Sequence, residues 1–232
     1  DRLEHMCGPA AKDIWASTFH SACIRILRRD IQRLDLGFTS SFTIYDSEDS
    51  KRVIRDIVKD MSLDEKDFAP RSVLSIISNA KDKDQGPDRF AQEAAASKVW
   101  RMPRIVEIYS GYQRRLREAN ALDFDDIIFH TVHLLQKDEE VRDYYQKKFR
   151  YVLVDEYQDT NHLQYLLARL LAGGRENICV VGDDDQSIYR FRGANIENIL
   201  NFEKQYAACR TIRLEQNYRS TQNILDAANA VI

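Results

Sequence analysis

The chain has little glycine and no paired cysteines, and both absences narrow what it can be. Only eight glycines occur in 232 residues, and none of them is followed by lysine. A phosphate-binding loop of the form G-x-x-x-x-G-K-[ST] is therefore absent from this sequence. The four cysteines, Cys7, Cys23, Cys179 and Cys209, form no C-x-x-C pair. They predict reduced core thiols of a cytosolic protein and argue against a disulfide framework or a zinc site.

Long apolar runs and a strong charge of one sign are also missing. No segment approaches the length of a membrane span, and no signal-peptide pattern opens the chain. The net charge is −3, so any contact with nucleic acid would depend on local Arg and Lys groups and on stacking. With 44% hydrophobic and 31% charged residues, the composition predicts a globular cytoplasmic protein, long enough for more than one domain.

Two short apolar runs that end in acidic residues are the most informative feature of the sequence. Residues 151–154 lead directly into Asp155 and Glu156, and residues 178–181 open into the acidic segment 182–186. Such runs are typical of buried parallel strands, and ligands bind just beyond the carboxyl ends of these strands. Asp155 could hold Mg²⁺, directly or through water, while Glu156 polarises a water for nucleotide hydrolysis. An acidic loop without special chemistry is the alternative.

Apolar periodicity predicts a helix over residues 17–34, with Ser17 or Thr18 as its cap. The apolar stripe of this helix consists of Cys23, Leu27, Ile31 and Leu34.

Residues 43–113 show helical periodicity and no predicted strand. Ser47 can cap the first helix of this segment, and Pro70 suits the first turn of another. The charged stretch 81–89 is expected to be a loop, and a longer helix beyond it is broken or kinked near Pro103. Basic side chains here could contact nucleic-acid phosphates, although solvated charge is the commoner role: Lys81, Lys83, Arg114, Arg115 and Arg117.

After residue 122 the pattern alternates between strands and helices, which predicts a parallel sheet. Asp123 or Asp125 is expected to cap one helix, and Asp159 or Thr160 the helix that follows residues 151–154. A further strand is expected over 211–214.

Five segments resemble motifs of the UvrD/PcrA/Rep group of superfamily 1 DNA helicases, and they occur in the order of that family. Residues 152–161 (VLVDEYQDTN) are similar to motif II, 181–189 followed by 192–194 to motif III, 212–220 to motif IV, 17–21 to motif Ib, and 122–126 to another recurrent segment. No single segment is specific, but together they span nearly the whole chain.

The resemblance implies an α/β fold: an incomplete RecA-like P-loop NTPase motor domain with a parallel sheet, and an all-helical inserted subdomain. Domain 1A would comprise 1–42 and 114–212, the insert 1B residues 43–113, and the truncated start of domain 2A residues 213–232. In the family, the P-loop strand and helix precede the first matching segment. The chain is therefore expected to be an excised piece that binds ATP poorly alone; a family member without ATPase activity is the alternative.

The resemblance also implies ATP and Mg²⁺ as cofactors, with a role for each of several side chains. Beside Asp155 as metal ligand and Glu156 as activator of water, Gln186 would sense the γ-phosphate or orient the water. Arg219 would act as an arginine finger, and Tyr218 would stack on the adenine. Gln158 and Asp159 have either a direct functional role or a role in the loop and a cap, and the sequence leaves this open.

The remaining candidates are DNA contacts. The resemblance places two near the single-strand path, Phe19 and His20, and gives three more in motif III, namely Tyr189, Phe191 and Arg192. Gln186 and Tyr189 share one loop, so movement at the γ-phosphate could reach the DNA. Many relatives carry Gly-Trp or Ser-Trp at 190–191, so Phe191 offers less stacking surface, for which Arg190 could compensate electrostatically.

The leading interpretation is part of a 3′→5′ ATP-dependent DNA helicase that translocates on single-stranded DNA and separates duplexes in repair or replication. Its expected partners are single-stranded DNA, duplex junctions and other repair or replication proteins, and the chain itself is expected to be monomeric. Two alternatives are a non-catalytic DNA- or protein-binding module of the same fold and a Mg²⁺-dependent nuclease that uses the acidic clusters. The nuclease does not explain Gln186, Tyr218 and Arg219.

Overall fold

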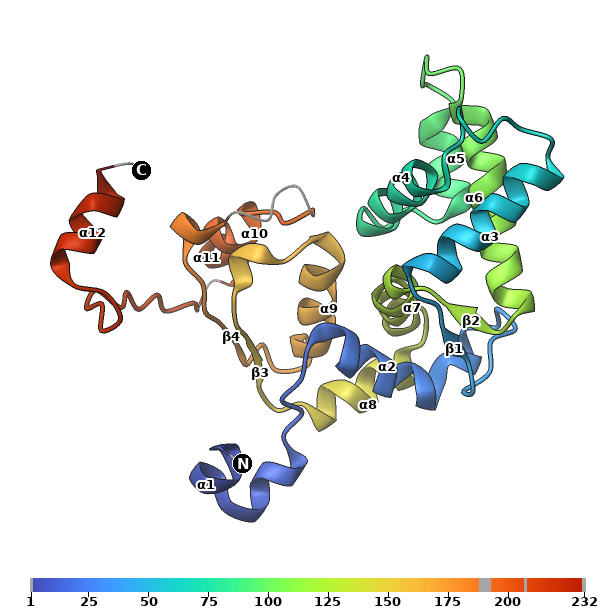
Figure 1. Ribbon diagram of the computed structural model, residues 1–232. Helices are drawn as coiled ribbons and strands as arrows, with labels where there is room; N and C mark the ends of the chain where they lie inside the picture. The colour runs from blue at the N-terminus through green and yellow to red at the C-terminus, as the bar shows by residue number, and fades with distance from the viewer. Residues whose placement is uncertain (1, 188–192, 207, 231–232) are drawn as a thin grey trace.

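The computed structural model describes residues 2–187, 193–206 and 208–230. Four residues discussed above, Tyr189, Arg190, Phe191 and Arg192, lie outside these ranges. The described part is mostly helical, with two small parallel sheets (Figure 1). None of its helices has both the length and the apolar character needed to cross a bilayer.

The α-helices and strands follow one another along the chain in this order: α1 (Arg2–Cys7), α2 (Phe19–Asp30), β1 (Thr43–Ile44), α3 (Ser47–Asp60), α4 (Pro70–Asp82), α5 (Pro87–Ala94), α6 (Met102–Glu118), β2 (Ala121–Leu122), α7 (Phe124–Lys137), α8 (Glu139–Lys148), β3 (Val152–Val154), α9 (His162–Ala172), β4 (Ile178–Val180), α10 (Glu197–Leu200), α11 (Phe202–Gln205) and α12 (Gln222–Asn229). Short 3₁₀ turns cover Gly8–Asp13, Ile31–Leu34, Tyr157–Asp159 and Asp184–Gln186.

The predicted helix over 17–34 is confirmed as α2 followed by a 3₁₀ turn to Leu34. Thr18 is its cap, because the Thr18 hydroxyl accepts a hydrogen bond from the amide of Ser21 at 3.3 Å. The whole predicted apolar stripe is buried. It packs with α7, α8 and α9 in the larger core of the molecule.

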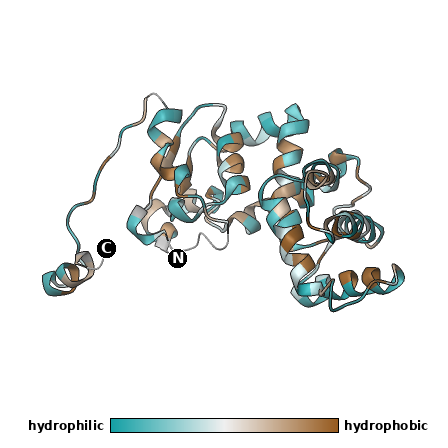
Figure 2. Cartoon of the chain, turned by 90° about the horizontal axis from the view of Figure 1, so that it is seen from above, coloured by the Kyte–Doolittle hydropathy of each residue, from teal (hydrophilic) through white to brown (hydrophobic). Residues whose placement is uncertain are grey.

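Helices α3 to α6 (47–118), here called the helical lobe, surround a core of their own. In Figure 1 the lobe lies on the side of α7 away from β3 and β4, and in Figure 2 the apolar sides of its helices face one another. The side chains of this core are Ile54, Ile57, Val58, Phe68, Val73, Ile77, Ala80, Ile105, Ile108, Tyr109, Tyr112 and Leu116, with Ala121 from β2.

Several expectations for 43–113 are corrected by the structure. The segment does contain a strand, because β1 pairs in parallel with β2. Asp46 caps α3 in place of Ser47, since its carboxylate accepts hydrogen bonds from the amides of Glu48 and Asp49. The expected loop 81–89 is shorter than predicted and covers residues 83–86, as α4 continues to Asp82 and α5 begins at Pro87, where a proline fits the first turn.

Two proline predictions for the lobe are confirmed. Pro70 stands in the first turn of α4, and α6 begins anew at Met102 with Pro103 in its first turn.

Of the two caps predicted for the next helices, the one for α7 is confirmed and the one for α9 is wrong. Asp123, and not Asp125, caps α7 in a reciprocal capping box with Asp126. Asn161 caps α9 in place of Asp159 or Thr160, and its side chain accepts a hydrogen bond from the amide of Gln164 at 2.9 Å. In both boxes the third residue of the helix bonds back to the cap amide, which satisfies two backbone donors together.

Strands β3 and β4 pair in parallel, in the register Val152↔Ile178, Leu153↔Cys179 and Val154↔Val180. One face of this pair packs on α9 and on Phe202, but the other face is open. The side chain of Leu153 is 75% exposed and Cys179 is also exposed. The prediction of fully buried strands is therefore wrong, because no described element covers the second face.

The exposure of two thiols corrects the prediction for the cysteines. All four thiols are free, as expected. Cys23 is buried in the larger core, but Cys7 and Cys179 are exposed, so only part of the set consists of core thiols.

The strand expected over 211–214 does not form. Ile212 and Leu214 are 69% and 86% exposed, and no described strand pairs with this segment. A strand without a neighbour lacks partners for its backbone N–H and C=O groups, so apolar side chains alone do not produce one. Beyond it, α12 stands apart from the rest of the described residues in both views (Figures 1 and 2).

Candidate functional site

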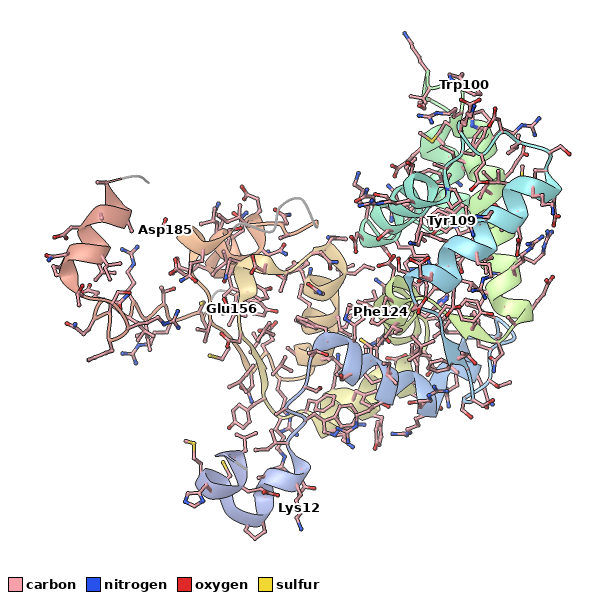
Figure 3. All side chains as sticks on the ribbon, viewed as in Figure 1. Lys12, Trp100, Tyr109, Phe124, Glu156 and Asp185 are labelled. Atoms are coloured by element: carbon pink, nitrogen blue, oxygen red, sulfur yellow. The ribbon has the colours of Figure 1, made fainter. Side chains whose placement is uncertain are left out.

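The acidic pair lies where β3 ends, and both carboxylates are exposed. Asp155 follows Val154 directly, and its Oδ1 accepts a hydrogen bond from the amide of Glu156 at 3.0 Å. Glu156 has a left-handed backbone with φ of +50°, which turns the chain sharply away from the strand. A left-handed residue other than glycine costs about 1–2 kcal/mol, and such strain is typical of functional sites. Figure 3 shows Glu156 at this end of the β3–β4 pair.

A buried glutamine joins this pair to the loop that follows β4. Gln158 donates from Nε2 to Oε2 of Glu156 at 2.9 Å, and its Oε1 accepts a hydrogen bond from the amide of Asp183 at 3.1 Å. The sequence left the role of Gln158 open; its side chain connects the segment that contains it, 152–161, to the second motif-like segment. Gly182 allows this approach, because a Cβ atom there would lie 2.5 Å from Oε1 of Gln158.

Gln186 lies on the same loop and hydrogen-bonds to Asp183. Its Nε2 donates to Oδ2 of Asp183 at 2.6 Å, and its backbone amide donates to the Asp183 carbonyl at 3.2 Å. Gln186 also lines a shallow cleft, wide open to solvent and about 480 Å³ in volume, together with Asn217, Tyr218 and Arg219. Gln186 therefore lies at one cleft with Tyr218 and Arg219, two further predicted nucleotide contacts that stand more than 30 residues later in the sequence.

Asn217 shapes the far wall of this cleft. Its Oδ1 accepts hydrogen bonds from the amides of Arg219 and Ser220, at 2.8 and 2.9 Å, which closes a tight turn. The side chain of Tyr218 is 94% exposed, so its ring is free to stack on a ligand. An aromatic face and a guanidinium suit an anionic ligand that carries a flat ring.

Phe19 and His20 stand at the start of α2. Phe19 is half-buried and packs against both neighbouring cores. The imidazole of His20 lies edge-on to the ring of Phe124, with centroids 5.6 Å apart. Burial lowers the pKa of His20, although Asp125 opposes this shift. A neutral imidazole beside the exposed ring of Phe124 offers an aromatic surface and no fixed positive charge.

Sequence reasoning missed one contact between the helical lobe and the site. Asp82, at the end of α4, accepts a hydrogen bond from Nδ2 of Asn161 at 2.8 Å. A Cβ atom on Gly193 would lie 3.2 Å from Oδ2 of the same Asp82, so the backbone after the acidic loop also comes close. Burial, and then the charge of Asp125, raise the pKa of Asp82 to about 7. No local signal predicts this contact, because its partners are 79 residues apart.

The donor set of the acidic pair fits magnesium. No group of three or more His, Cys, Asp or Glu side chains in the described ranges could enclose a metal. Mg²⁺ usually keeps several waters and takes one or two carboxylates together with substrate phosphates. Asp155 is exposed, and only its Oδ1 accepts a hydrogen bond from another described residue, so the side chain can supply such a ligand.

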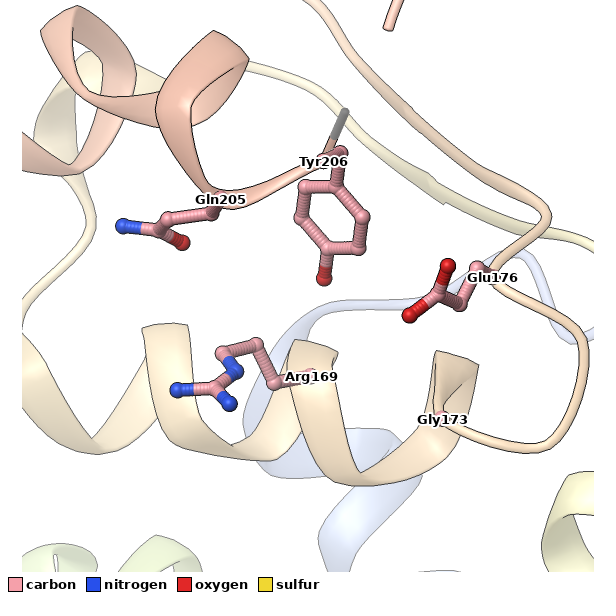
Figure 4. Close-up of a pocket in the computed structure, with 5 residues that line it drawn as sticks. All are labelled: Arg169, Gly173, Glu176, Gln205 and Tyr206. Atoms are coloured by element: carbon pink, nitrogen blue, oxygen red, sulfur yellow. The ribbon is translucent and has the colours of Figure 1, made fainter. Parts of the chain in front are cut away.

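A second cavity, of about 240 Å³, lies at the other end of α9 (Figure 4). Its walls are formed by Arg169, Gly173, Glu176, Gln205 and Tyr206. Because α9 begins beside the acidic pair and ends at this cavity, the two sites are separate. None of the predicted site residues that the structure describes lines this cavity.

Comparison with known proteins decides the family. A model of the UvrD/REP helicase N-terminal domain matches residues 1–207. The chain belongs to this UvrD/REP helicase family. The ATP-dependent DNA helicase PcrA of Staphylococcus epidermidis (strain ATCC 35984) is 51% identical over 231 residues, which cover 100% of this chain and 31% of the relative. The protein of the same name from Staphylococcus aureus (strain Mu50) is 51% identical over 232 residues, with the same coverage.

The UvrD/REP assignment confirms the family that the motif-like segments predicted. The match extends through the helical lobe, the acidic pair and the loop after β4. The chain spans 31% of the length of these curated relatives.

Proposed function

We propose that this chain is the first motor part of an ATP-dependent DNA helicase. Residues 1–42 and 114–212 would form RecA-like domain 1A, residues 43–113 the insert 1B, and residues 213–232 the start of domain 2A. The observation that carries the proposal is the convergence of Glu156, through Gln158 and Asp183, on Gln186 at a cleft lined by two further predicted nucleotide contacts. Membership of the UvrD/REP family and the name of the relatives support it.

The geometry suggests how the residues divide the work of hydrolysis. Asp155 would hold Mg²⁺, which when bound neutralises phosphate charge, and Glu156 would accept a hydrogen bond from the attacking water and polarise it. Gln186 would contact the γ-phosphate through its uncharged amide. Arg219 would balance the negative charge that develops on the phosphoryl group, and Tyr218 would stack on the adenine.

The phosphate cradle is the missing part of this arrangement. No glycine in these 232 residues is followed by lysine, so the chain supplies no P-loop. We therefore propose that the chain alone binds ATP weakly and does not hydrolyse it at a significant rate. The site would be complete only together with a P-loop from the rest of a larger protein.

The proposed substrate is single-stranded DNA, along which the helicase moves 3′→5′ before it separates a duplex junction in repair or replication. Phe19 and His20 would contact the strand, and so would three residues outside the described ranges, Tyr189, Phe191 and Arg192. Aromatic faces stack on bases with little sequence preference, at about 1–3 kcal/mol per base. The setting would be the cytoplasm, other repair or replication proteins would be partners, and the isolated chain would be monomeric.

Strand displacement by the complete protein of this gene tests the proposal. Duplexes with a 3′ single-stranded tail should be separated when ATP and Mg²⁺ are present, and duplexes with a 5′ tail should stay intact. Single-stranded DNA should also stimulate ATP hydrolysis. A complete protein that binds DNA without turnover would support the non-catalytic binding module instead. Preferential separation of 5′-tailed duplexes would refute the proposed 3′→5′ direction but not the proposed helicase activity.

A further inference from the structure

Gln158 is the only side chain among the described residues that hydrogen-bonds both to the acidic pair and to the loop after β4. It is 1% exposed, although its neighbours in the acidic pair face solvent. The amide of Gln158 donates to Glu156 and accepts from the backbone of Asp183, so neither end is left unpaired. A buried amide with both ends bonded is held in one orientation, because any rotation leaves polar groups unsatisfied.

Asp183 extends this connection to the ligand-facing glutamine. Its amide bonds to Gln158, its Oδ1 accepts from the amide of Asp185 at 3.1 Å, and its Oδ2 accepts from Gln186. A continuous path of four residues thus runs from Glu156 to Gln186. A change in the position of Gln186 therefore acts on the backbone that Gln158 holds.

The contact is specific for a neutral amide. Glutamate at 158 could accept from Asp183 but could not donate to Glu156, and it would add a second carboxylate there. The space is also closed, since a Cβ atom on Gly182 would come within 2.5 Å of Gln158 Oε1 and 2.8 Å of Cδ1 of Ile199.

We propose that Gln158 is a positioning residue, which orients the Glu156 carboxylate for water activation and couples it to the loop that carries Gln186. This inference rests on the proposed function, because it assigns Gln158 a part in the same hydrolysis. Gln158 itself touches neither water nor nucleotide in this role. It acts through Glu156, and it transmits the position of Gln186 to that carboxylate.

ATP turnover of the complete protein with saturating single-stranded DNA tests the role of Gln158. Gln158→Ala should lower kcat about 10–100-fold, the usual effect of losing a group that orients an active residue, with KM for ATP within about threefold of wild type. Gln113→Ala is the matched control, because Gln113 is also buried and donates to a carboxylate, that of Asp126 at 3.0 Å, but lies in the helical lobe. The control should lose stability and keep its kcat.

A double-mutant cycle separates positioning from simple stability. If Gln158 acts through Glu156, adding Gln158→Ala to Glu156→Gln should change the residual turnover by less than about twofold. If Gln158 had only a structural role, Gln158→Ala would lower ATP turnover by the same factor in wild type and in Glu156→Gln. That result would overturn the proposal.

Two further variants test the proposal in case Gln158→Ala does not fold. Gln158→Glu should lower kcat at least as much as Gln158→Ala, because it keeps an acceptor for Asp183 and loses the donor to Glu156. Gly182→Ala should also lower kcat, since its methyl group displaces the Gln158 amide. Wild-type kcat in either variant, with a normal far-UV CD spectrum, would contradict the proposal.

The single variant Glu156→Gln distinguishes failure of the proposed catalytic role of Glu156 from failure of the positioning role of Gln158. If Glu156→Gln turns over like wild type, the proposed catalytic role of Glu156 is wrong. If Glu156→Gln is inactive while Gln158→Ala matches wild type, only the positioning role of Gln158 is wrong.

Discussion

The ammonium group of Lys81 lies 2.7 Å from Oδ2 of Asp123, and neither side chain is more than 5% exposed. Asp126 stands equally close, with its Oδ1 2.7 Å from the same nitrogen. Tyr112 donates to Asp123 at 2.8 Å, and Gln113 donates to Asp126. The group joins α4 and α6 of the helical lobe to the start of α7. The sequence predicted a solvated or phosphate-binding Lys81, and both interpretations are wrong.

Replacing Lys81 should destabilise the fold strongly. Burial alone would lower the pKa of Lys81, but Asp123 and Asp126 raise it well above its ordinary value, so the ammonium stays charged. Lys81→Met would leave two buried carboxylates without their cation, at a cost of about 3–5 kcal/mol. Urea unfolding of the chain measures this loss. Lys83→Met, at an exposed position two residues away, is the control and should stay within about 0.5 kcal/mol of wild type; equal stability of the two variants would contradict the buried pair.

His130 should make the fold sensitive to acid. Both of its ring nitrogens are buried without a hydrogen-bond partner in the described structure. Burial, and then the charge of Lys81, lower the pKa of His130 to about 3. The unfolded chain binds this proton near pH 6.5, so stability from the neutral imidazole is full above pH 6.5 and is lost as pH falls toward 3.

His130→Leu should remove this part of the acid sensitivity. Relative to wild type, the variant should gain about 2 kcal/mol on going from pH 8 to pH 5, because each pKa unit corresponds to about 1.36 kcal/mol. Chemical unfolding of both proteins at the two pH values measures the difference. If the difference in unfolding free energy between the variant and wild type is the same at both pH values, the imidazole is solvated or paired.

Asp82 should make the folded chain less stable as pH rises, which is opposite to the effect of His130. Its pKa of about 7 in the folded chain lies above that of an unfolded aspartate, so the folded state binds more protons between pH 4 and 7. The contribution of Asp82 to stability therefore falls as pH rises through this window. Asp82→Asn keeps an oxygen that can accept from Asn161, and should be more stable than wild type at pH 8 by ~1–2 kcal/mol, a value reduced for partial exposure. Thermal unfolding at pH 5 and pH 8 measures it, and a less stable variant at pH 8 would contradict the expectation.

Local signals predicted part of the local structure, although two helix caps were assigned to the wrong residue. The stripe of α2, its Thr18 cap and the first-turn prolines depend on neighbouring residues, so they can be derived from sequence spacing. Strand burial could not be derived in this way. A strand was expected over both 151–154 and 211–214, but a strand needs a neighbour to pair with, and only the first segment has one among the described residues.

The residues of the candidate site could be predicted from the sequence, but the contacts between distant segments could not. The motif-like strings marked Asp155, Glu156 and Gln186, because residue type and order along the chain were enough. The partners of Gln158 were not predictable, since its acceptor contact comes from a loop 25 residues away. Which end of an amide bonds to which group depends on how those two segments approach each other.

The central claim is that Glu156 activates the water that attacks ATP. The most direct test is to compare wild type with Glu156→Gln in the complete protein, measuring nucleotide binding and DNA-stimulated hydrolysis on the same preparations. The variant should bind ATP with an affinity within about threefold of wild type, because the amide keeps the size of the side chain. It should hydrolyse ATP at least ~10²-fold more slowly, the usual loss when a general base is removed. Equal turnover in the two proteins would contradict the account.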